Sequence, residues 1–257
     1  MLGILALIFS TSTIGTITGF GTSILMMPVL MMFFPVHECL VFVTIIHWFN
    51  GLWRLLLFKK GFDPRLIMTF GVAGILSAIA GAKLAFLFSE IFLVGFTSVF
   101  LIIYSAYLLK NPKFAFKFSS VTAITGGVFA GFIAGVIGMG GAIRAAILSA
   151  FNLPKDVYLA NSALLLVLID SARLWAYFQE GVNIPELINL ASWPGNNPYL
   201  SLALGILVSF PGVNLGKYLV ERIPQEKFRI AIAVFLLVVG IKSLVGCFQV
   251  ILPAENT

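Results

Sequence analysis

The feature that most constrains this chain is a series of long apolar stretches, which leave little sequence for a water-facing surface. About eight such blocks follow one another, at 2–34, 39–58, 66–88, 91–109, 119–151, 157–178, 199–220 and 228–250. A helix needs roughly 20 apolar residues to cross the hydrocarbon core of a bilayer. Only 10% of the residues are charged, whereas soluble domains carry about 25%. The chain is therefore predicted to be an all-α integral membrane protein with one transmembrane domain.

The first and fifth blocks are too long for a single straight crossing. Each runs to 33 residues, which is about 50 Å of helix at a rise of roughly 1.5 Å per residue, and tilt rarely absorbs so much. Both blocks carry glycines near their centre: Gly15, Gly19 and Gly21 in the first, and Gly131, Gly135, Gly138, Gly140 and Gly141 in the fifth. We predict that each block is a broken or re-entrant pair of short helices.

The distribution of basic residues favours this arrangement. If every block crossed once, the basic residues of the loops would divide six against six. If blocks one and five each enter and leave on the same side, the division is eleven against one, with only Lys83 on the sparse face. The positive-inside rule prefers the second arrangement. The sparse face would also hold the long polar loop at 179–198 and both termini, and we predict that it is external.

An internal repeat relates the two halves of the chain. An offset of 119 residues places Gly19 on Gly138 and Arg54 on Arg173, and towards the end of each half the offset grows to 135. The first repeat, 1–110, is predicted to hold a broken hairpin and three helices. Three crossings are an odd number, so the second repeat, 119–250, is predicted to be inverted. Inverted repeats with discontinuous helices are typical of secondary transporters, which bind substrate near the midplane.

Charged side chains inside the apolar blocks need a reason, because each costs about 2.5–3.5 kcal/mol on insertion scales. The candidates are Arg54, Arg144, Asp170, Arg173 and Lys242. Three arginines against one aspartate leave surplus positive charge, which an anion would neutralise. A guanidinium group also suits sulfonate or carboxylate oxygens, since it presents paired donors to them.

Two interpretations are open for Arg54, for the Asp170–Arg173 pair and for His47, whereas Lys242 is interpreted as a partner for a polar interior residue. Arg54 shares a helical face with His47 and Asn50, which predicts an anion site, or it snorkels to the nearby membrane boundary. Asp170 and Arg173 form either a structural ion pair or a pair that substrate or a proton displaces. His47 either carries a proton for coupling or gating or is a hydrogen-bonded packing residue.

The glycine breaks predict a second part of the site. A short helix that starts at the midplane directs free backbone N–H groups at a ligand. One such cradle would contain Gly19, Gly21, Thr22 and Ser23, and the other Gly138, Gly140 and Gly141. The alternative is helix packing through small residues.

Three segments carry a resemblance to a known family. They are GFGTSILMMPVL at 19–30, GFIAGVIGMGGAIRAAIL at 131–148 and GKYLVERIPQEKFRIAIAVFLLVVGIKSL at 216–244. They resemble the TauE/SafE family of sulfite-exporter-like permeases, over nearly the whole chain. The resemblance implies transport of sulfite, organosulfonates or related small oxyanions across the bacterial cytoplasmic membrane. The second repeat departs from the pattern, since Ile147 stands opposite Pro28 and Arg144 opposite Leu25.

These observations favour a secondary transporter for a small anion that works by alternating access, driven by protons or by the anion's own gradient. A passive anion channel uses the same residues. A non-transporting membrane assembly factor would instead use Cys39, Cys247 and the methionines as metal ligands. The sequence contains no HExxH, CxxC or Walker motif, so we expect no enzyme, cofactor or metal. The 16 basic residues are scattered, which argues against nucleic acid as a partner.

Overall fold

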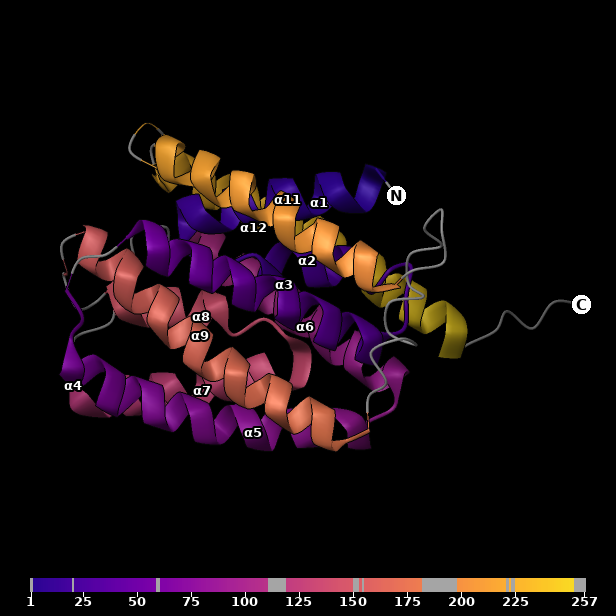
Figure 1. Ribbon diagram of the computed structural model, residues 1–257. Coiled ribbons are helices and arrows are strands. Elements are labelled where there is room, and N and C mark those ends of the chain that lie inside the picture. Colours follow the sequence, from indigo (N-terminus) through magenta and orange to yellow (C-terminus); the bar gives the residue numbers. More distant parts are fainter. Residues whose placement is uncertain are drawn as a thin grey trace, which may run out of the picture.

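The computed structural model describes residues 2–19, 21–58, 61–110, 119–149, 153, 155–181, 198–220, 222 and 225–251, and every regular element within them is helical. The first half contains α1 (Leu2–Thr18), α2 (Ser23–Leu30), α3 (Val36–Leu57), α4 (Pro64–Leu66), the π-helical stretch η1 (Ile67–Gly71), α5 (Val72–Leu87) and α6 (Glu90–Lys110). The second half contains α7 (Ser120–Ile137), α8 (Gly141–Ser149), α9 (Lys155–Gln179), α11 (Pro198–Leu219) and α12 (Gln225–Ile251). The axes of the long helices are roughly aligned with one another (Figure 1).

Glycines interrupt both of the overlong apolar blocks, as predicted. In the first block, helix ends at Thr18 and resumes at Ser23, and Gly19 and Gly21 between them adopt positive φ angles of 72° and 90°. In the fifth block, α7 is followed by its C-terminal cap Gly138, which has a φ of 77° and donates its N–H to the carbonyl of Ala134. Left-handed backbone is nearly free of strain only for glycine, so these residues fix the positions of the breaks.

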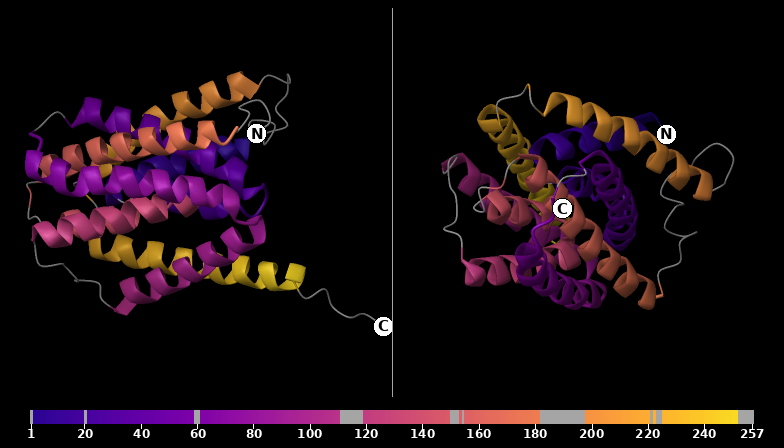
Figure 2. Two further views of the ribbon diagram at one scale, coloured as in Figure 1. Left: turned by 90° about the horizontal axis from the view of Figure 1, so that it is seen from below. Right: turned by 60° about the vertical axis from the view of Figure 1, so that its left-hand side comes forward.

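Four helix pairs build the bundle: α1 with α11, α5 with α7, α3 with α9, and α6 with α12. In each of these pairs one helix comes from each half of the chain, so the halves are interleaved (Figure 2). The pair α3–α9 lies between α1–α11 and α5–α7 in Figure 1. Gly21 of the first break faces His47 of α3, and Gly138 of the second break lies near Leu40 of α3 and Arg173 of α9.

Small residues allow two of these pairs to approach closely. A side chain at Gly131 of α7 would collide with the carbonyl of Gly74 in α5. A side chain at Gly212 or Gly216 of α11 would collide with carbonyls of α1, those of Phe9 and Thr13. Such close backbone contact is typical of membrane helices, where dispersion contacts replace the hydrophobic driving force.

Six helical segments in the described chain are long and apolar enough to cross a membrane: Val36–Leu57, Pro64–Leu87, Glu90–Tyr107, Ser120–Ile137, Val157–Gln179 and Leu202–Leu219. Leu2–Thr18 and Ala233–Cys247 are apolar but shorter. The fifth block, predicted as a broken pair, contains α7, which is long enough to cross by itself, and the last block, predicted to cross, contains the shorter apolar segment Ala233–Cys247.

The start of α1 and the end of α12 lie at the same end of the bundle. In Figure 1, α1 begins and α12 ends on the right-hand side, where α9 also ends and α11 begins. The opposite end carries α4, which contains Arg65, and the end of α11 near Lys217. Several residues that were used to predict the orientation lie outside the described residues. They are the loop segment 182–197 and Lys59, Lys60, Lys113 and Lys117.

Candidate functional site

The break between α1 and α2 lies against α3. A side chain at position 21 would collide with Nε2 of His47, so the imidazole approaches a backbone that only glycine leaves open. His47 is buried, and its Nε2 has no hydrogen-bond partner among the described residues. The first break and the polar face of α3 therefore form one site.

His47 belongs to a buried ionic network with two residues of α9. Its Nδ1 donates to Oδ2 of Asp170 over 2.7 Å, and Oδ1 of the same carboxylate accepts from Nη1 of Arg173 over 2.6 Å. All three side chains are at most 2% exposed. The predicted i, i+3 ion pair is therefore present, and His47 is hydrogen-bonded across the α3–α9 interface, as its packing interpretation requires.

Arg173 also joins this network to the second break. Its Nη2 donates to Oγ1 of Thr44 over 2.8 Å and to the hydroxyl of Tyr177 over 3.3 Å. The Tyr177 hydroxyl in turn donates to the carbonyl of Gly135 in α7 over 2.7 Å. A side chain at Gly138 would stand 3.6 Å from Nη2 of Arg173. The guanidinium of Arg173 is thus held by α3 and α9 directly, and it is linked to α7 through Tyr177.

Arg54 and Arg144 are buried without comparable compensation. They are 1% and 3% exposed, and in each of them Nε and Nη2 find no hydrogen-bond partner within the described part of the chain. A snorkelling arginine places its guanidinium at the water boundary. The burial of Arg54 contradicts that interpretation and places its charge in the interior.

The charged residues form one electrostatic cluster, in which Arg144 interacts with each of the other members. Arg144 interacts electrostatically with Arg54 and with both members of the Asp170–Arg173 pair. Tyr158 of α9 interacts with both Arg54 and Arg144. With His47 counted as neutral, the three arginines and one aspartate of this cluster carry a formal charge of +2.

The polar residues predicted around the first break are also buried. Asn50 donates Nδ2 to the carbonyl of Ile46 over 3.0 Å. Its Oδ1 and the hydroxyl of Ser23 have no hydrogen-bond partner among the residues described. Thr22 is buried as well, at the N-terminal cap of α2. This part of the site therefore offers an unused acceptor and an unused hydroxyl.

The predicted glycine cradles differ in what surrounds them. A side chain at Gly19 would stand 2.9 Å from the hydroxyl of Tyr158, so that position faces the cluster. A side chain at Gly140 would collide with the carbonyl of Ala130 in α7. The helix-packing interpretation therefore describes Gly140. Gly141, the first residue of α8, is buried.

Three residues of the cluster were not singled out from the sequence. Thr44 lies one turn before His47 on α3, and Tyr177 lies one turn after Arg173 on α9, so helical spacing alone could have found both. Tyr158 had no such signal. Its proximity to Gly19, Arg54 and Arg144 arises only from packing between distant segments.

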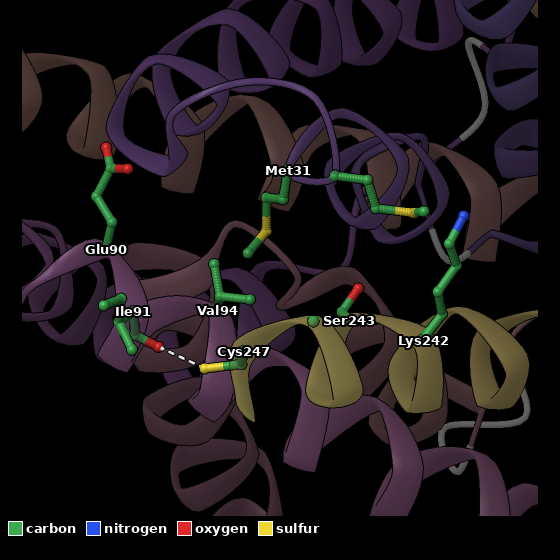
Figure 3. A pocket seen from close by; sticks show the side chains of 9 residues that line it. Met31, Glu90, Ile91, Val94, Lys242, Ser243 and Cys247 are labelled. Atoms are coloured by element: carbon green, nitrogen blue, oxygen red, sulfur yellow. Dashed lines mark hydrogen bonds between the residues drawn. The ribbon is translucent and has the colours of Figure 1, made fainter. Parts of the chain in front are cut away.

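Lys242 lies outside this buried cluster. It is exposed and lines a pocket of about 370 Å³ together with Glu90, Cys247 and residues of the segment that follows α2. Figure 3 shows Glu90 and Lys242 at opposite ends of this pocket, with Cys247 Sγ donating to the carbonyl of Ile91 over 3.5 Å. Lys242 therefore does not serve as a partner for the polar residues of the buried cluster.

The cysteines do not suggest a metal site. Cys39 is buried in α3, and Cys247 is partly exposed beside the pocket of Figure 3. Within the described residues, no group of three or more His, Cys, Asp or Glu side chains is placed to hold a metal ion.

Comparison with known proteins adds one finding. The family model described as "Sulfite exporter TauE/SafE" matches residues 4–243 of the chain. No curated protein gives a significant match. The matched range includes both glycine breaks and every charged residue of the buried cluster.

Proposed function

The chain belongs to the sulfite exporter TauE/SafE family, and on that premise we propose that it is a secondary transporter. It would move a small anion, such as sulfite, an organosulfonate or a similar oxyanion, across the cytoplasmic membrane by alternating access. The observation that carries this proposal is the buried cluster around Arg54, Arg144 and Arg173, whose positive charge exceeds its negative charge.

Energetics favour an anion as the missing partner. Buried charges are tolerated when they are paired and hydrogen-bonded, and are otherwise costly. The Nε and Nη2 groups of Arg54 and Arg144 lack partners among the described residues, and guanidinium donors bind oxyanions with short, strong hydrogen bonds. The proposed binding site therefore contains these two residues with Arg173, Asn50 and the first glycine break.

The helix boundaries support the proposed inverted repeat. α1 and α7 end at 18 and 137, and α3 and α9 begin at 36 and 155, which is a separation of 119 in both cases. The helix pairing agrees with this repeat. If α7 is the counterpart of α1 and α11 is the counterpart of α5, then the contact between α1 and α11 is the counterpart of the contact between α7 and α5. Each break would then come from one repeat, and we propose that the two broken pairs enter the membrane from opposite faces.

Alternating access requires an element with two arrangements, and α3 with α9 is our candidate. These helices carry His47, Asp170 and Arg173 at their interface and contact both breaks. We propose that Asp170 holds Arg173 until substrate or a proton on His47 weakens the pair. Histidine titrates near physiological pH, so a proton gradient is the proposed source of energy.

Uptake into proteoliposomes tests this function. Labelled sulfite, sulfoacetate and a carboxylate control are supplied with and without a pH gradient, to wild-type protein, to Arg54→Gln and to Arg173→Gln. Lys83→Gln serves as the matched control, because it removes one positive charge from an exposed position. We expect saturable uptake that depends on both arginines, is unchanged in Lys83→Gln, and is stimulated by the gradient.

The other possible results are equally informative. Uptake that follows the anion gradient alone and ignores the pH gradient would indicate a channel or uniporter and overturn the coupling proposal. Uptake that persists in both arginine variants would show that the proposed site is wrong. Wild-type vesicles that match empty vesicles for all three anions would overturn transport of this substrate class.

A further inference from the structure

The three buried arginines are not equivalent. Arg173 donates to Asp170, Thr44 and Tyr177, and although its Nε has no partner among the described residues, its charge is paired with that of Asp170. Arg54 and Arg144 each have two N–H groups without a partner among the described residues, and the one carboxylate of the cluster is already occupied. The uncompensated charge of the cluster therefore belongs to Arg54 and Arg144.

We propose that the anion binds between Arg54 and Arg144, beside Tyr158, and that this site selects dianions over monoanions. The inference rests on the proposed function, since it assumes that the transported anion is the partner of these arginines. It goes beyond that function in naming the charge of the ligand and in adding Tyr158 as a contact.

The charge of the cluster determines the selectivity. Asp170 and Arg173 cancel each other, and two positive charges remain on Arg54 and Arg144. A monoanion would leave one of these charges uncompensated in a buried site, whereas a dianion would leave none. An ion with two acidic groups also matches two guanidinium groups, since each can then receive its own paired hydrogen bonds.

Tyr158 brings this pair of charges to the first break. Its hydroxyl lies beside Gly19, and its ring packs with Leu159 and Phe58 near the end of α3. It is also the electrostatic neighbour that Arg54 and Arg144 share. An oxyanion between the two arginines would therefore lie within reach of the Tyr158 hydroxyl.

Ser23 gives a second, independent indication of a ligand at this break. It is the first residue of α2 and is 1% exposed, and its hydroxyl has no hydrogen-bond partner in the described chain. A buried hydroxyl without a partner is unfavourable. Its place at the start of α2, four residues from Gly19, agrees with an anion bound there.

Ligand-dependent thermal stability of the purified protein tests the proposal without requiring transport. Sulfoacetate, a dianion, and methanesulfonate, a monoanion, share the sulfonate group, and each is titrated to find the concentration that gives half of its stabilising effect. We expect sulfoacetate to act at a concentration at least about tenfold lower than methanesulfonate. The preference should disappear in Arg54→Gln and in Arg144→Gln and persist in Lys83→Gln. Tyr158→Phe should weaken sulfoacetate binding about tenfold.

Two results would overturn the proposal. One is equal stabilisation by the two anions, or by neither, in the wild-type protein. The other is a melting temperature of ligand-free Arg54→Gln or Arg144→Gln far below that of the wild type, because removal of an uncompensated buried charge should not destabilise the fold. If sulfoacetate binds selectively but is not taken up by proteoliposomes, the dianion site stands and the transport function fails.

Discussion

Replacing Asp170 by Asn is expected to destabilise the protein by about 3–5 kcal/mol, the range for removing one partner of a buried ion pair. Asp170 is 2% exposed, and its two oxygens are 2.7 Å from His47 Nδ1 and 2.6 Å from Arg173 Nη1. Asparagine keeps the shape and one acceptor but removes the cluster's negative charge, so the formal charge rises by one. For a soluble domain of similar size, this loss corresponds to about 6–20 °C in melting temperature.

The assay is a double-mutant cycle on protein purified in detergent, followed through tryptophan fluorescence on thermal or denaturant unfolding. Asp170→Asn, Arg173→Gln and the double variant are compared. The double variant should lose much less than the sum of the single losses, because it removes both charges together. Asp63→Asn is the matched control, since Asp63 caps α4 and Asn caps a helix about as well as Asp. Additive losses, or a loss in Asp170→Asn no larger than in Asp63→Asn, would refute the buried ion pair.

Three further predictions concern single positions. Gly21→Ala should abolish uptake while leaving membrane insertion intact, because position 21 has a φ of 90° and no space for a side chain; normal uptake would show that the break is not part of the site. Gly131→Ala should destabilise the protein by about 1–3 kcal/mol in thermal unfolding, since its side chain would collide with α5, whereas Gly246→Ala has open space around it and should lose nothing. Equal melting temperatures would contradict this packing. Cys39→Ala and Cys247→Ala should retain uptake, and loss of function in both would instead favour the assembly-factor hypothesis.

Much of the fold could be predicted from local signals. The lengths of the apolar blocks gave the helices, and the glycine clusters gave the breaks at Gly19–Gly21 and Gly138, because left-handed backbone and close helix contact both require glycine. The sequence does not mark the end of a helix where apolar residues continue through the following turn. The first block shows this, since residues 31–34 continue its apolar run but follow the end of α2.

The site was predictable only in part, because the sequence gives the face of a helix but not its partner. The shared face of His47, Asn50 and Arg54 follows from spacing, and all three are buried together. The pairing of His47 with Asp170, 123 residues away, depends on how α3 and α9 are rotated against one another. The aligned halves show that Gly51 stands opposite Asp170, but only the rotation shows which arginine the aspartate compensates.

The contact register of α3 and α9 explains why the two halves of the cluster differ. Thr44 contacts Arg173, and His47 contacts Asp170. The two helices therefore run antiparallel at this interface, and the residue numbers of each contacting pair add up to 217. Position 51 meets position 166 at the same register, where a side chain on Gly51 would collide with Leu166. An offset of 119 relates 47 to 166 and 51 to 170, so these two contacts occupy equivalent places in the proposed repeat. One place holds an imidazole and a carboxylate, and the other holds a leucine against a glycine. A single negative charge thus serves three arginines, which is why the uncompensated positive charge falls on Arg54 and Arg144.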